Sequence, residues 1–122
     1  MKKEIASKAV IHREGRMLLQ YRDSDPEIYH PDHWGFFGGL IESRETPEEG
    51  LLRELAEELG WHAPNCEDLL SWLPNRDTII HLYLVDLNVP LCDLKLREGS
   101  GMALVKVSEI QAWKLAPEVR LH

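Results

Sequence analysis

The middle of the chain encodes a helix whose two ends are both marked by residue type. Thr46 is a suitable N-cap, Pro47 favours the first helical position, and Glu49 completes a capping box with Thr46. Gly60 can take the left-handed conformation that commonly follows the last residue of a helix. The pattern therefore predicts a helix over residues 47–59, which any fold of this chain has to accommodate.

Three glutamates, Glu54, Glu57 and Glu58, share one side of this predicted helix. At 3.6 residues per turn they fall within an arc of about 100°, beside a stripe of leucines. Like charges at this spacing cost roughly a few tenths of a kcal/mol, and the C-terminal end of a helix disfavours anions further. A solvated acidic face is one interpretation. The other is a site for a hard divalent cation such as Mg²⁺, which takes carboxylates and substrate phosphates as ligands.

The residues before the helix predict a strand that ends in a glycine turn. Residues 34–40 read Trp-Gly-Phe-Phe-Gly-Gly-Leu. Gly38 and Gly39 allow the backbone to come close to a ligand or an ion, because glycine has no side chain. The predicted order is therefore strand, glycine-rich turn and acidic helix.

The segment from residue 39 to residue 61 resembles the Nudix box. That box consists of Gly, five residues, Glu, seven residues, and then Arg-Glu-apolar-x-Glu-Glu-x-Gly-apolar. Trp61 stands where an aliphatic residue is usual, and Phe37 stands where many members have Pro. The residues that match in register are Gly39, Glu45, Arg53, Glu54, Leu55, Glu57, Glu58 and Gly60.

The resemblance implies an α/β fold, the α/β/α sandwich with a mixed β-sheet, and a hydrolase activity. Members of the family hydrolyse a phosphoanhydride in a nucleoside diphosphate linked to another group, by attack of water with Mg²⁺ or Mn²⁺ present. By resemblance, Glu54, Glu57 and Glu58 hold the metal, and the Gly39 carbonyl adds a backbone ligand. Glu54 is also the family's candidate for orienting or deprotonating the water, and the sequence does not separate these roles.

Further site residues follow from the same resemblance. Arg53 is expected to pair with Glu45 as a supporting residue, with ordinary surface charges as the alternative. Glu98 resembles the Glu of a loop that reaches the metal in MutT-type members, although a single Glu in a turn is usually only solvated. Arg22 resembles a phosphate-facing Arg at the end of a strand, and an exposed Arg is the equal alternative. Gly38 and Gly39 are expected to approach the substrate.

The polar loop before Trp34 raises a zinc hypothesis. His30 and His33 flank Asp32, but no further Cys or His pair stands nearby with ligand spacing. A loop that covers the substrate is favoured over a metal site, because Tyr29 and Trp34 provide aromatic surface. Trp34 itself is expected to pack in the core.

Length and charge limit the remaining possibilities. The chain has 122 residues, which fits one domain over residues 1–122. The net charge of −7 disfavours broad binding to nucleic acid, which needs a basic surface, but not binding of a small-molecule nucleotide through a metal. Cys66 and Cys92 are far apart in sequence and suggest reduced thiols. With no signal segment and no long apolar run, the expected location is the cytosol, as a monomer or a homodimer.

The rest of the chain predicts strands and two short helical segments. A turn at Glu14-Gly15 predicts a hairpin, Pro74 to Asp77 predicts a second turn, and Ser108 is a candidate cap for a helix that runs to Trp113. A helical turn is expected from Pro117. The predicted strands span residues 5–12, 17–21, 68–73, 78–87 and 102–107.

The substrate is less defined than the reaction. MutT-type enzymes that act on oxidised purine nucleotides use an Asn near the C-terminus, and residues 114–120 contain none. A nucleoside triphosphate or a nucleotide sugar therefore remains the expectation. The alternative function is a catalytically silent Nudix-fold nucleotide sensor or interaction module. Such proteins usually lose carboxylates of the box, whereas this chain keeps them all.

Overall fold

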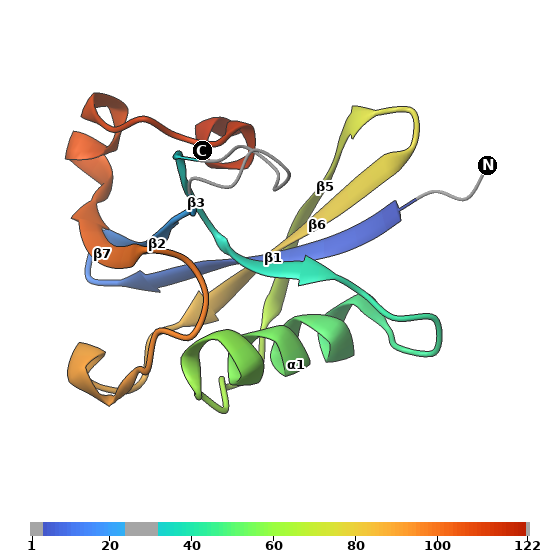
Figure 1. Ribbon diagram of the computed structural model, residues 1–122, viewed down its shortest axis with the longest axis horizontal. Coiled ribbons are helices and arrows are strands. Elements are labelled where there is room, and N and C mark those ends of the chain that lie inside the picture. The colour runs from blue at the N-terminus through green and yellow to red at the C-terminus, as the bar shows by residue number, and fades with distance from the viewer. Residues whose placement is uncertain (1–3, 24–31, 122) are drawn as a thin grey trace.

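Strand β1 (Glu4–Arg13) is the centre of the sheet in the computed structural model, which describes residues 4–23 and 32–121 (Figure 1). It runs parallel to β6 (Thr78–Asp86) from Glu4 to His12. On its other side it pairs with two antiparallel strands in succession, β4 (Phe37–Leu40) and then β2 (Arg16–Tyr21). Hydrogen bonds to neighbours on both sides therefore fix β1 along its length.

The other strands complete a mixed sheet of seven strands within the described residues. Strand β5 (Glu67–Asn75) pairs with β6, and both β3 (Trp34–Gly35) and β7 (Gly101–Lys106) pair with β2. The β1–β2 hairpin turns at Glu14 and Gly15, which both have positive φ as predicted for a tight hairpin. The predicted mixed sheet is confirmed.

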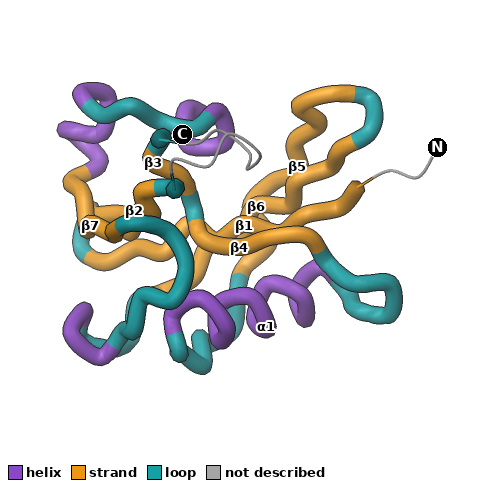
Figure 2. Tube along the Cα trace, in the orientation of Figure 1, coloured by secondary structure: helices purple, strands orange, loops and turns teal. Residues whose placement is uncertain are grey.

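Helix α1 (Pro47–Leu59) covers one face of the sheet, and short 3-10 helices cover the other (Figures 1 and 2). Leu51, Leu55 and Leu59 of α1 are fully buried in the core on the helix side. Leu115 and Val119 belong to a second core on the opposite face. The second outer layer of the expected sandwich is thus made of 3-10 turns, which are η2 (Val107–Ala112) and η3 (Pro117–Leu121). A further 3-10 turn, η1 (Leu91–Asp93), lies between β6 and β7.

The ends of α1 are those that the sequence predicts. Thr46 Oγ1 accepts a hydrogen bond from Glu49 N at 3.1 Å, and Glu49 Oε1 accepts one from Thr46 N at 2.9 Å. Gly60 is left-handed, with φ of 61°. The predicted bounds of 47–59 are confirmed, because the signals that set them act within a few residues.

Three local predictions differ from the structure. Gly38 and Gly39 lie inside strand β4 rather than in a turn after it, because they are the residues that pair with β1. Ser108 does not cap a helix, since η2 already begins at Val107 and has no side-chain cap. Strand β5 continues through Pro74 to Asn75, so the predicted four-residue turn is shorter.

The fold does not settle two predictions, the covering loop before Trp34 and the cytosolic location. Tyr29 and His30 lie outside the described residues, and so does most of the predicted covering loop. None of the helices in the described ranges has both the length and the apolar content that a membrane span requires.

Candidate functional site

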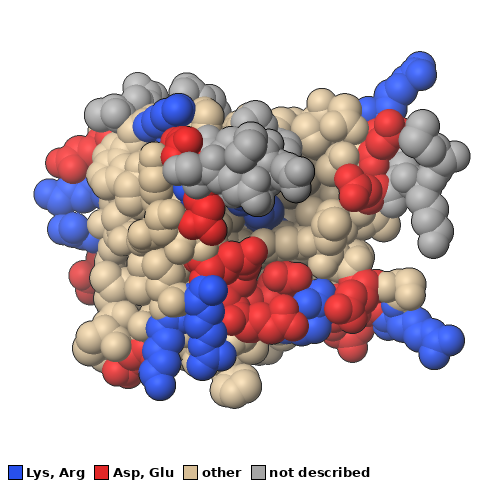
Figure 3. Space-filling model, in the orientation of Figure 1, with Lys and Arg blue, Asp and Glu red and all other residues tan. Residues whose placement is uncertain are grey.

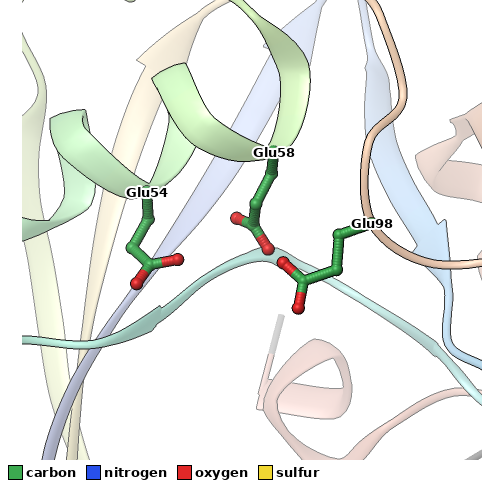
Figure 4. Close-up of side chains that lie close together, drawn as sticks. All are labelled: Glu54, Glu58 and Glu98. Atoms are coloured by element: carbon green, nitrogen blue, oxygen red, sulfur yellow. The ribbon is translucent and has the colours of Figure 1, made fainter.

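Three carboxylates converge where the end of α1 faces the loop before β7. Glu54 and Glu58 come from successive turns of α1, and Glu98 comes from the loop and points toward Glu58 (Figure 4). Each side chain offers an oxygen, and these oxygens lie within 4.8 Å of one another. In residues 4–23 and 32–121 no other such group of three His, Cys, Asp or Glu side chains occurs.

Glu58 is the buried member of the group, with 3% of its surface exposed. Its Oε1 accepts a hydrogen bond from Gly38 N at 2.9 Å, which joins the helix to strand β4. Burial raises the pKa of Glu58 well above its ordinary value, and the neighbouring carboxyl of Glu98 raises it further, while Lys8 opposes the shift. Burial also raises the pKa of Glu54, against the attraction of Arg53. Burial therefore makes the free anion less favourable at both carboxyls.

Glu98 reaches the group because its loop is bonded to the end of α1. We call residues 95–100 the strap. Lys95 N donates to Leu59 O at 2.9 Å, and Arg97 N donates to Glu58 O at 2.8 Å. The last carbonyls of a helix have no partner within it, so the strap supplies the missing donors. The same bonds set Glu98 opposite Glu58.

Arg53 holds the outer carboxylates. Its Nε donates to Glu45 Oε2 at 2.7 Å and its Nη2 to Glu45 Oε1 at 2.9 Å, which is the expected pairing in bidentate form. This contact lowers the pKa of Glu45 to about 2. Arg53 Nη1 also donates to Glu54 Oε1 at 3.1 Å and contacts Glu57. Arg53 thereby offsets the like-charge repulsion among the helix glutamates.

The structure does not bring Glu57 into the group of three. Its side chain is 59% exposed, and its Oε2 lies 3.2 Å from Arg53 Nη1. Figure 3 shows acidic atoms gathered on this face of the molecule, with basic side chains beside and between them. Glu57 therefore belongs to the acidic surface at the rim, whereas Glu54, Glu58 and Glu98 form the centre.

A cavity beside the carboxylates contains two of the predicted substrate residues and several that the sequence did not indicate. Arg22 and Gly38, both predicted to contact the substrate, line it. Gly39 lies against Glu54, since a Cβ built on it would be 3.0 Å from the Glu54 carboxylate. The sequence indicates Gln20 only in that it is a polar residue inside the apolar run of strand β2. The cavity is lined by Gln20, Arg22, Asp23, Gly38, Glu58, Glu98 and Gly99.

The chemistry of this donor set suits a hard divalent cation. Its donors are carboxylate oxygens alone, two of them on residues whose burial disfavours the free anion, and Mg²⁺ and Mn²⁺ prefer such oxygens. The zinc hypothesis is not tested, because His30 lies outside the described residues. Asp32 accepts a hydrogen bond from the Tyr21 hydroxyl at 3.4 Å.

Comparison with known proteins gives one family. Residues 2–120 match the NUDIX domain. The chain is 35% identical over 112 residues to the CTP pyrophosphohydrolase of Escherichia coli K12, a match that covers 89% of this chain and 80% of that protein. It is 40% identical over 55 residues to the 8-oxo-dGTP diphosphatase of Proteus vulgaris, which covers 43% of this chain and only 49% of that protein.

The fold has a close counterpart among solved structures. The MutT NUDIX hydrolase from Burkholderia pseudomallei superposes with a TM-score of 0.83 at 22% identity, and the alignment covers 99% of this chain and 95% of that one. At this identity the likeness concerns the fold, and it confirms the predicted architecture.

Proposed function

This chain belongs to the NUDIX domain family, and we propose that it hydrolyses a phosphoanhydride bond in a nucleoside diphosphate derivative with Mg²⁺ or Mn²⁺ as cofactor. The observation that carries the proposal is the group of Glu54, Glu58 and Glu98 beside a cavity that Arg22 also lines. The names of the two relatives, both nucleotide hydrolases, favour a nucleoside triphosphate as the substrate. We place this reaction in the cytosol and in a single domain.

Glu54, Glu58 and Glu98 would hold the metal. Gly39 lies against Glu54 and would add its carbonyl, and Glu57 would join from the rim by leaving Arg53. When bound, Mg²⁺ neutralises charge on phosphate oxygens and makes water more acidic. The proposed ligands are thus the residues that already converge, and Glu57 is the one ligand that has to move.

The protein groups around the metal would position and activate the reactants. Arg22, on the cavity wall, would bind a phosphate oxygen of the substrate. Glu54 would take the proton of the attacking water, because burial brings its pKa closer to neutrality and a base works best near the operating pH. As the water oxygen bonds to phosphorus, the bridging oxygen leaves with the second phosphate. Arg53 would keep Glu54 oriented through its bond to Oε1.

A substrate panel tests the reaction and its metal requirement. Nucleoside triphosphates, nucleotide sugars and ADP-ribose would be incubated with Mg²⁺, with and without EDTA. We expect hydrolysis of at least one class and its loss in EDTA. Glu57→Gln should lower kcat/KM by about tenfold or more if Glu57 becomes a ligand. Glu48→Gln, an exposed change on the same helix, is the matched control. Turnover that ignores both EDTA and Glu57→Gln contradicts the proposal.

Metal affinity should rise with pH. Glu58 is protonated below its raised pKa, and a cation has to displace that proton, so binding strengthens as the pH approaches this pKa from below. Between about pH 6 and about pH 8.5 we expect the affinity for Mn²⁺ to increase by up to about tenfold per pH unit. Electron paramagnetic resonance of free Mn²⁺ measures this directly. Glu58→Gln should flatten the profile, and a flat wild-type profile contradicts the assignment.

A further inference from the structure

Gln20 is a buried amide in a strand that otherwise buries apolar side chains. Only 4% of its surface is exposed, and its neighbours Leu18 and Leu19 are fully buried. A primary amide in such a place is costly unless its groups are hydrogen-bonded. Its Nε2 donates to the main-chain oxygen of Glu98 at 2.9 Å. The buried polar group of β2 is therefore directed at the residue that supplies the third carboxylate.

The strap passes Gln20 at very short range. A Cβ built on Gly99 would lie 2.8 Å from Gln20 Cγ and 2.9 Å from Tyr21 O, so only glycine fits there without displacement. One residue later, Ser100 N donates to Tyr21 O at 2.8 Å. The Ser100 hydroxyl also donates to Asp23 Oδ1 at 2.7 Å. The end of β2 thus fixes the strap immediately after Glu98.

Glu98 is consequently held from three directions. Arg97 N, before it, is bonded to the end of α1, and Ser100, after it, is bonded to β2. Gln20 bonds to the carbonyl of Glu98 itself and fixes the orientation of the peptide that follows. The backbone bonds at Arg97 and Ser100 hold the strap on either side of Glu98, whereas the Gln20 bond acts at the residue whose carboxylate faces Glu58.

We infer that Gln20 is a positioning residue of the metal site, which acts by holding the main chain of Glu98 so that its carboxylate stands opposite Glu58. The inference rests on the proposed function, in which Glu98 is a metal ligand. Gln20 also lines the cavity, but it is not a metal ligand in this assignment. Its effect on the site has to pass through Glu98, and that dependence can be measured.

The test is a double-mutant cycle read out as the affinity for Mn²⁺ alone, by electron paramagnetic resonance. Gln20→Met keeps the length of the side chain and removes the donor. We expect it to weaken Mn²⁺ binding by about tenfold, as changes behind a metal ligand commonly do. Glu98→Gln should weaken binding at least as much. The double variant should match Glu98→Gln within about twofold, because Gln20 has nothing left to position.

Two further variants separate positioning from folding. Leu19→Met, a change to the same residue type on the same buried strand, should leave Mn²⁺ affinity unchanged. Gly99→Ala disturbs the contact between Gln20 and Glu98 from the side of the strap. It should therefore weaken Mn²⁺ binding as Gln20→Met does, and it should have no further effect in the Glu98→Gln background. Thermal unfolding in EDTA checks that each variant is folded. If Gln20→Met does not fold, Gly99→Ala provides the same test.

The possible results have distinct meanings. The inference is overturned if Gln20→Met lowers the affinity for Mn²⁺ equally in the wild-type protein and in the Glu98→Gln variant. It is also overturned if Gln20→Met binds Mn²⁺ as tightly as the wild type while Glu98→Gln binds it weakly. Wild-type affinity in Glu98→Gln also overturns it, but leaves hydrolysis through Glu54 and Glu58 standing. Failure of the wild-type protein to bind Mn²⁺ or to hydrolyse any nucleotide rejects the proposed function itself.

Discussion

Replacing Glu58 by Gln is expected to lower the hydrolysis rate by about 10³-fold, or roughly 4 kcal/mol of transition-state stabilisation. Glu58 is the buried carboxylate at the centre of the site, and an amide cannot supply the negative charge that a divalent cation requires. The measurement is kcat/KM on the best substrate of the panel at saturating Mg²⁺. The exposed change Glu48→Gln on the same helix should stay near the wild-type value.

The same replacement should make the metal-free protein more stable. The pKa of Glu58 is raised on folding, so the folded chain binds a proton that the unfolded chain releases at neutral pH. The resulting penalty is absent below the unfolded pKa and grows as the pH rises toward the folded pKa. The amide introduced by Glu58→Gln keeps an acceptor for Gly38 N without this penalty, and we expect a gain of about 1–2 kcal/mol at pH 7 in EDTA. A large loss of stability would instead mark Glu58 as structural.

The second large effect is expected from Gly38→Ala. A Cβ at this position would lie 2.1 Å from Ser7 O and 2.9 Å from Lys8 Cα, and the φ of 133° is unfavourable for alanine. Strand β4 would have to separate from β1. Strain and overpacking together should cost about 3–5 kcal/mol, a large part of the stability of a small domain. Urea unfolding in EDTA measures the loss.

Gly15→Ala is the matched control for Gly38→Ala. Gly15 also has a positive φ, of 75°, but nothing lies within 4 Å of a Cβ built there. It should therefore show only the cost of the backbone conformation, about 1–2 kcal/mol. If the two variants unfold at similar urea concentrations, close approach of β4 to β1 is not what Gly38 provides.

The parts of the fold that the sequence predicts well are those set by neighbouring residues. The capping box at Thr46 and the left-handed Gly60 determine both ends of α1 without help from the rest of the chain. The predicted turn at Gly38 and Gly39 is wrong because their pairing depends on a distant part of the chain. Sequence shows that Gly38 needs room, but not whether a turn or an adjacent strand takes up that room, and here it is β1.

The site was less accessible to prediction than the helix that carries it. The spacing of Glu54, Glu57 and Glu58 points to a metal, whereas Glu98 is predicted only through the family resemblance, because the backbone donors that place the strap leave no trace in residue type. Gln20 had a weak signal, a polar residue in an apolar strand. The exposure of Glu57 at the rim could not be foreseen, because it depends on the position of Arg53.

The double-sided pairing of β1 has a thermodynamic consequence for the metal site. The backbone of Gly38 and Gly39 pairs with β1, which has partners along both edges, so the metal site is joined to the centre of the sheet. A cation that binds there and not to the unfolded chain raises the global free energy of unfolding by an amount that grows with the logarithm of its free concentration relative to its Kd. The cofactor thereby becomes a stabiliser of the entire domain.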